Sequence, residues 1–239
     1  MINEIAEAII DPVYFSPFIP LTVTCFHKLT CVISSSLLFA TGPDRGILYQ
    51  SAVNKADFIS AFATHSNLSV LALTETWIHA KNIATPAALA SDFNFSHTSR
   101  PNRRGGGTGL LLSKTWKFTC LSPSCSYTSF EFHAVTVTDP AKMHFLVVYR
   151  PPGQLGKFID EFDTLLSTIP DDGTPLLVLG DINIHLDKPH AADFLALLPT
   201  FDLKQFTTPA THKAEQPPGH QAVWLQEQPL HGDCSAFRH

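Results

Sequence analysis

The sequence of 239 residues lacks an excess of positive charge, a cysteine framework and a zinc motif. It has 16 lysines and arginines against 21 aspartates and glutamates, so its net charge of −5 gives no global attraction to a polyanion such as nucleic acid. The five cysteines include no CxxC pair, and no HExxH sequence occurs. The cysteine pattern therefore favours free thiols in a reducing, intracellular compartment, either nucleus or cytoplasm.

Residues 1–49 are apolar but lack the features of a membrane span or a signal peptide. His27 and Lys28 interrupt the centre of the apolar stretch, where a charge is costly in a bilayer. The beginning of the chain carries Glu4 and Glu7 instead of the basic residues of a signal peptide. An atypical N-terminal extension is the favoured interpretation, and attachment to a membrane is the weaker alternative.

A regular pattern begins near residue 50. The hydrophobic content of 44% with 15% charged residues is typical of a globular protein. Apolar residues at helical spacing predict helices over 54–66, 85–93, 156–170 and 190–201. Continuous or alternating apolar runs predict strands over 68–75, 108–113, 129–138, 144–151 and 175–183. This mixture predicts an α/β fold with a mixed sheet.

Two details of the predicted helices can be checked directly. In the first helix, Phe58 is expected on the buried face with Ile59, Phe62 and Ala63. In the second helix, Thr85 is expected to cap the amino-terminal end. Beyond residue 216 all periodicity stops, so the predicted domain spans 50–216 and an irregular tail follows over 217–239.

Polar residues stand where two predicted strands end. Asp181 and Asn183 follow an apolar run, and Glu75 ends the strand at 68–75. Positions i and i+2 share a face of a strand, and ligands of α/β sheets bind at the carboxyl ends of strands. Two carboxylates and an amide suit a hard cation such as Mg²⁺ or Mn²⁺. The same Gly-Asp-x-Asn sequence is also typical of a turn, so both interpretations stay open.

The glycine-rich segment at 100–112 is not a nucleotide-binding loop. Its spacing fits neither GxxxxGK[ST] nor GxGxxG, and a strand follows where a helix would be needed. Its arginines, Arg100, Arg103 and Arg104, suit either contact with a phosphate backbone or a solvated basic turn.

Five short motifs follow one another in the order "LTETW", "RRGGGTG", "VVYRPPG", "GDINIHLD" and "TTPATHK". Together they resemble the endonuclease domain of non-LTR (LINE-type) retrotransposons, within the endonuclease/exonuclease/phosphatase superfamily. The resemblance covers about residues 50–216. It implies a two-sheet α/β sandwich, DNase I-like, that hydrolyses DNA phosphodiester bonds with Mg²⁺ or Mn²⁺ and without a small-molecule cofactor.

The resemblance also implies roles for individual residues. Glu75 would bind the metal, Asp181 would orient or activate the attacking water, and Asn183 would hold the scissile phosphate. Tyr149 would hydrogen-bond a phosphate oxygen. The residues expected to contact the DNA substrate are Arg104, Arg150 and Thr211.

Three departures from the family pattern predict impaired catalysis. Leu48 or Tyr49 stands where the family has a metal-binding Asn, and the chain after Lys213 has no "LDL"-type Asp. The family's Ser-Asp-His triplet, whose Asp–His pair does acid–base work, does not occur. These gaps predict a sandwich without its first and last strands and a slow enzyme. The alternative is a non-catalytic remnant of a mobile-element reading frame.

Overall fold

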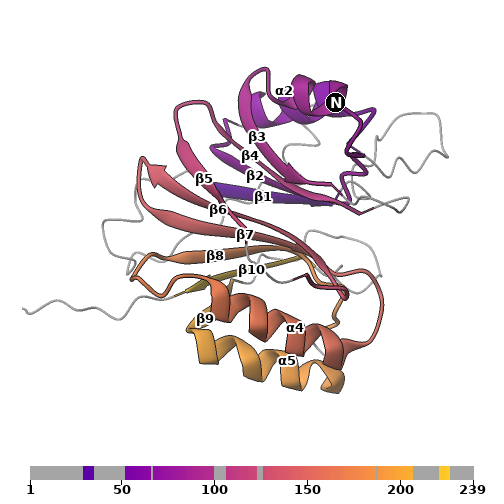
Figure 1. Ribbon diagram of the computed structural model, residues 1–239, viewed down its shortest axis with the longest axis vertical. Coiled ribbons are helices and arrows are strands. Elements are labelled where there is room, and N and C mark those ends of the chain that lie inside the picture. Colours follow the sequence, from indigo (N-terminus) through magenta and orange to yellow (C-terminus); the bar gives the residue numbers. More distant parts are fainter. Residues whose placement is uncertain are drawn as a thin grey trace, which may run out of the picture.

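The computed structural model describes residues 29–34, 52–65, 67–99, 106–122, 126–186, 188–206 and 221–226. They form two β-sheets that pack face to face, with helices on both outer faces (Figure 1). The predicted two-sheet α/β sandwich is therefore confirmed. None of the helices in the described ranges has the length and apolarity of a membrane span.

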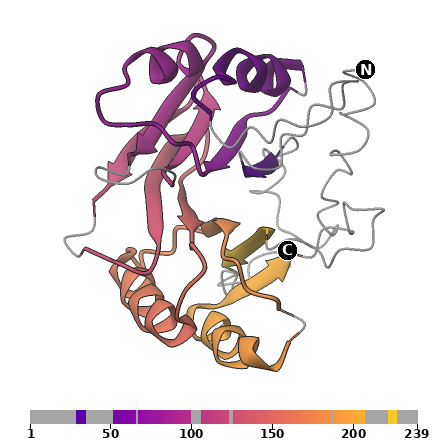
Figure 2. The ribbon, with the colours of Figure 1, turned by 90° about the vertical axis from the view of Figure 1, so that its right-hand side faces the viewer.

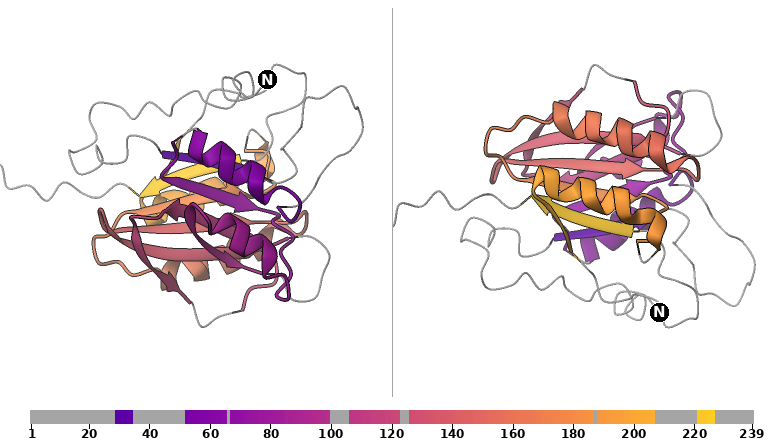
Figure 3. Two further views of the ribbon diagram at one scale, coloured as in Figure 1. Left: turned by 90° about the horizontal axis from the view of Figure 1, so that it is seen from above. Right: turned by 90° about the horizontal axis from the view of Figure 1, so that it is seen from below.

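The first sheet has four strands, in the order β1-β2-β4-β3. Their bounds are β1 (Leu29–Ser34), β2 (Val70–Thr74), β4 (Thr108–Ser113) and β3 (Phe93–Thr98). β1 runs parallel to β2, and the other pairs are antiparallel. Two helices, α2 (Ala56–His65) and α3 (Ala84–Leu89), cover the outer face of this sheet, as the view from above in Figure 3 shows.

The second sheet has six strands, in the order β5-β6-β7-β8-β10-β9. Their bounds are β5 (Lys117–Leu121), β6 (Glu131–Asp139), β7 (Met143–Tyr149), β8 (Leu176–Asp181), β10 (Gln221–Gln226) and β9 (Leu203–Phe206). Only β7 and β8 are parallel, and the helix α4 (Leu155–Thr168) connects them. A second helix, α5 (Ala192–Leu197), lies beside α4 on the outer face, flanked by 3₁₀ turns at Pro189–Ala191 and Leu198–Phe201 (Figure 2).

Apolar side chains fill the three spaces between these four layers. Trp116 and Phe145 lie in the layer between the two sheets. The layer between the second sheet and its helices contains Phe158, Phe162 and Phe194, whose rings contact one another. Burial of these large side chains is the main favourable contribution to the stability of the sandwich.

Two details of the helices differ from the prediction. In α2, Ile59, Phe62 and Ala63 are buried as expected, but Phe58 is 42% exposed because it lies at the margin of the apolar stripe. α3 begins at Ala84, so Thr85 does not cap it; instead the N–H of Thr85 donates to Asn82 Oδ1 at 3.1 Å.

Two strands lie in ranges that the sequence analysis placed outside the domain. β1 comes from the range 1–49, and β10 comes from the range 217–239. The interpretation of these ranges as an extension and an irregular tail outside the domain is wrong at these two strands. β10 pairs with β8 on one side and with β9 on the other, so backbone hydrogen bonds support a strand whose sequence shows no alternation.

Candidate active site

The inward faces of the two sheets change from apolar to polar along their strands. Alternation places every second residue of a strand on the same face. Starting in the apolar layer, the inward positions are Leu177, Leu179 and Asp181 on β8, Phe145, Val147 and Tyr149 on β7, Val135, His133 and Glu131 on β6, Val70, Ala72 and Thr74 on β2, and Leu112, Leu110 and Thr108 on β4. We call the group Thr74, Thr108, Glu131, Tyr149 and Asp181 the polar end of the inter-sheet layer.

Three of the predicted site residues meet at this polar end. Tyr149 ends β7 opposite Asp181, its partner in the pairing of β7 with β8. The Tyr149 hydroxyl donates a hydrogen bond to Oε1 of Glu75, which directly follows β2 in the other sheet. Burial raises the pKa of Tyr149, and the hydrogen bond to Glu75 and the negative charges of Glu75, Asp181 and Glu131 raise it further. Tyr149 is therefore a protonated hydrogen-bond donor at neutral pH.

The Gly-Asp-x-Asn segment forms a turn at the end of β8. The N–H of Asn183 donates to Asp181 Oδ1 at 3.1 Å, which is the side-chain-to-backbone bond of an Asx turn. Asn183 has a φ of 49°, a left-handed conformation that Asn tolerates better than most residues. Because this turn begins at Asp181, beside Tyr149, the two interpretations left open by the sequence are compatible.

Gly180 on β8 has a backbone conformation that leaves no room for a side chain beside β7. Its φ is 147°, and a Cβ at this position would lie 1.8 Å from the carbonyl oxygen of Val148. The neighbouring atom belongs to the backbone and has no freedom to move aside. Only glycine fits at this position between the two strands that carry Tyr149 and Asp181.

Arg150 is buried, with 5% of its surface exposed. Its guanidinium donates to the carbonyl oxygens of Ile182 at 3.1 Å, Asn183 at 3.0 Å and Gly153 at 2.5 Å. The guanidinium carbon also lies 5.4 Å from the centre of the Phe158 ring, and burial lowers the pKa of the group. These contacts correct the predicted role as a substrate contact, because the guanidinium supports the turn from inside the protein.

Two other predicted residues, Arg104 and Thr211, lie outside the described residues. Their expected contacts with substrate stay predictions.

Glu131 is a carboxylate at the polar end that the sequence analysis did not single out. It is the cross-strand partner of Tyr149, and its Oε2 accepts the N–H of Gly107. A usable signal was present in the sequence, since Glu131 shares one face of its strand with Val135 and Val137. A charge on such an inward face indicates a specific partner.

The donor set formed by Glu75 and the polar end fits a hydrated Mg²⁺ or Mn²⁺ ion. In the described part of the chain, no three or more His, Cys, Asp or Glu side chains form a metal-binding group. However, Mg²⁺ keeps several of its waters and needs only one or two carboxylates, such as those of Glu75 and Asp181. The hydroxyls of Thr74 and Thr108 are fully buried and have no hydrogen-bond partner among the described residues. They are suited to bond waters held by such an ion.

Comparison with known families finds one match by sequence. The model of the Endonuclease/Exonuclease/phosphatase family matches residues 42–224. No curated protein matches the chain by sequence.

Several solved structures have a similar fold. The endonuclease domain of TRAS1, a telomere-specific non-LTR retrotransposon, has a TM-score of 0.60 at 8% identity, covering 83% of this chain and 84% of its own. TDP2 of D. rerio, complexed with single-strand DNA product, has a TM-score of 0.53 at 12% identity, covering 74% and 78%. A mannosyl-6-phosphatase of Bacteroides thetaiotaomicron has a TM-score of 0.52 at 12% identity, covering 82% and 84%. At these identities the likeness is one of fold.

Proposed function

The chain belongs to the endonuclease/exonuclease/phosphatase family, a superfamily of phosphodiester hydrolases, and we propose that it is a metal-dependent DNA endonuclease of the non-LTR retrotransposon type with a reduced rate. The observation that carries the proposal is the hydrogen-bonded pair of Glu75 and Tyr149 beside Asp181. The fold likeness to the TRAS1 endonuclease domain, and to a TDP2 complexed with DNA product, supports DNA as the substrate.

Each side chain at the site suits one part of phosphodiester hydrolysis. Glu75 and Asp181 would hold Mg²⁺ or Mn²⁺, which supplies positive charge to the phosphate oxygens when bound. Asp181 orients or activates the attacking water. Tyr149 has a single hydroxyl hydrogen, which it donates to Glu75. Once Glu75 holds the metal, this hydrogen would turn to a phosphate oxygen.

Asn183 is proposed to hold the scissile phosphate. Its Nδ2 already donates to the carbonyl oxygen of Arg150 at 2.7 Å, and this bond fixes the direction of the side-chain amide. A side-chain amide carries two hydrogens, so the second can donate to the phosphate. Arg150 contributes as a positioning residue, whereas Arg104 and Thr211 are proposed to contact the DNA backbone.

The reduced rate follows from the missing Asp–His pair. General acid–base catalysis by such a pair contributes about 10²- to 10⁴-fold, and no Ser-Asp-His triplet occurs in the sequence. The same gap favours the second candidate, a non-catalytic remnant that keeps the fold. The two differ in whether any metal-dependent cleavage occurs.

Nicking of a supercoiled plasmid distinguishes the two candidates. We expect slow nicking with Mg²⁺ or Mn²⁺ and none with a chelator. Asp181→Asn should abolish the nicking, because it removes the negative charge of Asp181. The variant keeps an oxygen that can accept the N–H of Asn183, so the turn itself should persist. Asp160→Asn, on the exposed side of α4, is the matched control and should leave the rate unchanged. A folded wild-type protein that never nicks would establish the remnant instead.

A further inference from the structure

A turn formed by Gly106 and Gly107 joins the end of β2 to the second sheet. The carbonyl of Gly107 accepts the N–H of Thr76 at 3.1 Å, and the carbonyl of Gly106 accepts the N–H of Trp77 at 2.8 Å. On its other side, the N–H of Gly107 donates to the Glu131 carboxylate on β6. The turn is therefore held between the segment that follows β2 and a carboxylate of the other sheet.

The tight fit of this turn leaves little freedom for the segment after β2. A Cβ on Gly107, whose φ is 90°, would lie 2.4 Å from Oγ1 of Thr76, so the Gly107 backbone lies directly against the Thr76 side chain. Glu75 itself has a φ of 53°, a conformation that costs free energy for a residue other than glycine. Such a conformation persists only where surrounding contacts impose it.

These contacts form a closed loop that connects Glu131, the glycine turn, Glu75 and Tyr149. Glu75 directly precedes Thr76, and its carboxylate accepts the Tyr149 hydroxyl. Tyr149 is in turn the cross-strand partner of Glu131. Starting from Glu131, one path reaches Glu75 through the glycine turn and Thr76, and the other reaches it through Tyr149. Both paths cross from one sheet to the other.

We propose that Glu131 is a positioning residue for Glu75: it anchors the Gly106–Gly107 turn against Thr76 and Trp77 and so fixes where the Glu75 carboxylate points. The contribution of Glu131 is its acceptor oxygen for the N–H of Gly107. The consequence for metal binding rests on the proposed function, whereas the consequence for the backbone does not. Residues that orient a metal ligand typically change metal affinity ten- to a hundredfold when removed.

Two substitutions separate an acceptor from a charge. Glu131→Gln keeps an oxygen at the same distance from the backbone but removes the negative charge, whereas Glu131→Ala removes both. The matched control is Glu161→Ala on α4, since Glu161 also accepts backbone N–H groups, those of Thr128 and Ser129, away from the candidate site. All variants are made in the full chain.

The first measurement is amide hydrogen exchange at Thr76, Trp77 and Gly107. We expect at least about tenfold faster exchange in Glu131→Ala, near wild-type exchange in Glu131→Gln, and no local change in Glu161→Ala. The second measurement is the affinity for Mn²⁺, which should fall at least about tenfold in Glu131→Ala and be largely kept in Glu131→Gln.

Two results would overturn the inference. Unchanged exchange at these amides in Glu131→Ala would show that Glu131 does not anchor the turn. Equal loss of Mn²⁺ affinity in Glu131→Gln and Glu131→Ala would show that Glu131 acts through its charge. If the wild-type protein neither binds Mn²⁺ nor nicks DNA, the proposed function fails, and the exchange rates still decide whether Glu131 holds the turn.

Discussion

The two carboxylates proposed to hold the metal, those of Asp181 and Glu75, stand on strand ends that are built in different ways. After β8, the turn of Asp181 begins with a bond between residues two apart, and the guanidinium of Arg150 then supports it. After β2, the described contacts of the segment around Glu75 come from distant parts of the chain. The turn at Gly106–Gly107 binds its backbone, and Tyr149, 74 residues away, binds its carboxylate.

This difference shows how a single site can depend on local and long-range contacts at once. The turn after β8 has an intrinsic preference, because Asp and Asn form such turns in many proteins. The segment after β2 has no comparable preference, since its left-handed Glu75 is imposed by neighbours. We therefore expect the turn after β8 to be disrupted when its packing against β7 or its support by Arg150 is removed. The conformation after β2 should be disrupted when contact between the two sheets weakens.

The largest expected effect is at Gly180, where the β8 end packs on β7. Gly180→Ala should destabilise the protein by about 4 kcal/mol, because the new Cβ would collide with the backbone of Val148. Urea unfolding measures the change. Gly156→Ala on α4 is the control, since a Cβ there meets no described atom within 4 Å and alanine favours a helix. Equal stability of the two variants would contradict the proposed close contact.

Arg150→Met should cost about 3 kcal/mol, because it leaves the carbonyls of Ile182, Asn183 and Gly153 without their buried donor. Arg150→Lys should restore little of this, since an ammonium group does not reproduce the planar fork of the guanidinium. Thermal or urea unfolding gives the free energies.

Lys117→Met serves as the control for Arg150→Met. Lys117 has a side chain that is 79% exposed and pairs with Asp139 at 3.7 Å, so its loss should change stability by less than about 0.5 kcal/mol. If Arg150→Met were equally mild, the turn after β8 would be held by its local bond alone.

Acid should weaken the contact between the two sheets, on which the segment after β2 depends. His133 on β6 hydrogen-bonds Ser96 at 2.7 Å and Thr98 at 2.9 Å, both on β3, and thereby links the two sheets. Burial, together with the nearby His97, lowers the pKa of His133 to about 4 from the ordinary 6.5. Protonation therefore favours the unfolded chain, and stability should fall as the pH drops from about 6.5 towards 4, by on the order of 2 kcal/mol.

The stability of wild type and His133→Gln over this pH range tests the link between the sheets. The variant should lose less stability on acidification, because Gln has no proton to gain. Amides of β3 and β4 should exchange faster in acid, after correction for the intrinsic rate, than those of β7 and β8. Parallel pH profiles of the two proteins would rule His133 out as the cause.

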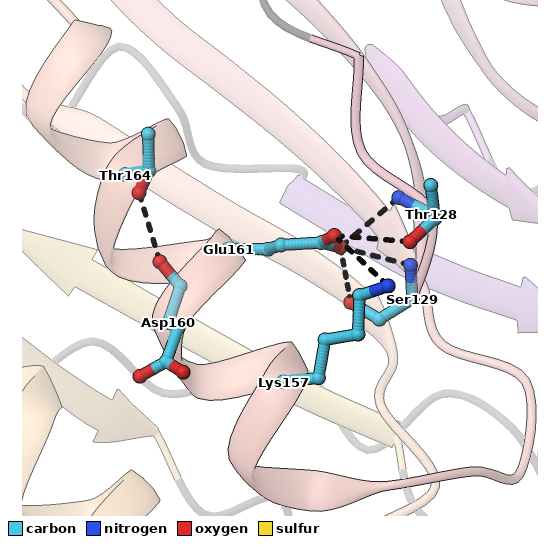
Figure 4. A network of polar contacts seen from close by, with 6 residues as sticks. All are labelled: Thr128, Ser129, Lys157, Asp160, Glu161 and Thr164. Carbon is cyan, nitrogen blue, oxygen red and sulfur yellow. Dashed lines mark hydrogen bonds and ion pairs between the residues drawn. The ribbon is translucent and has the colours of Figure 1, made fainter.

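The smallest effect is expected far from both strand ends. Figure 4 shows the Glu161 carboxylate on α4 accepting bonds from the N–H and hydroxyl groups of Thr128 and Ser129. Burial acts to raise the pKa of Glu161, but these bonds outweigh it and lower the pKa to about 2. Its contribution is therefore present above pH 4.5 and lost as the pH falls towards 2.

Glu161→Gln should cost about 1 kcal/mol at neutral pH, because an amide replaces one acceptor oxygen with a donor. Mn²⁺ affinity and plasmid nicking should not change. A loss of metal binding in this variant would mean that effects of charge reach across the second sheet, and the contrast between the two strand ends would then not be local.

Pattern and motif order were enough to predict the architecture and the family. Phe158, Phe162, Leu165 and Leu166 repeat at helical spacing, and all four are buried on α4. The apolar run before Asp181 predicted β8, and the Asp181–Asn183 spacing predicted the turn. These features depend on residues close in the chain, whose periodicity and turn preference act before any long-range contact forms.

Contacts between distant segments could not be predicted in this way. The inward direction of Arg150, the bond from Tyr149 to Glu75, the anchoring of Gly107 by Glu131 and the insertion of β10 between β8 and β9 all join residues separated by many positions. Which neighbour a side chain or a strand edge meets is decided by how the sheets pack, because the same local sequence can satisfy its polar groups in several ways. The strand ends were therefore predictable one at a time, and their assembly into one site required the fold.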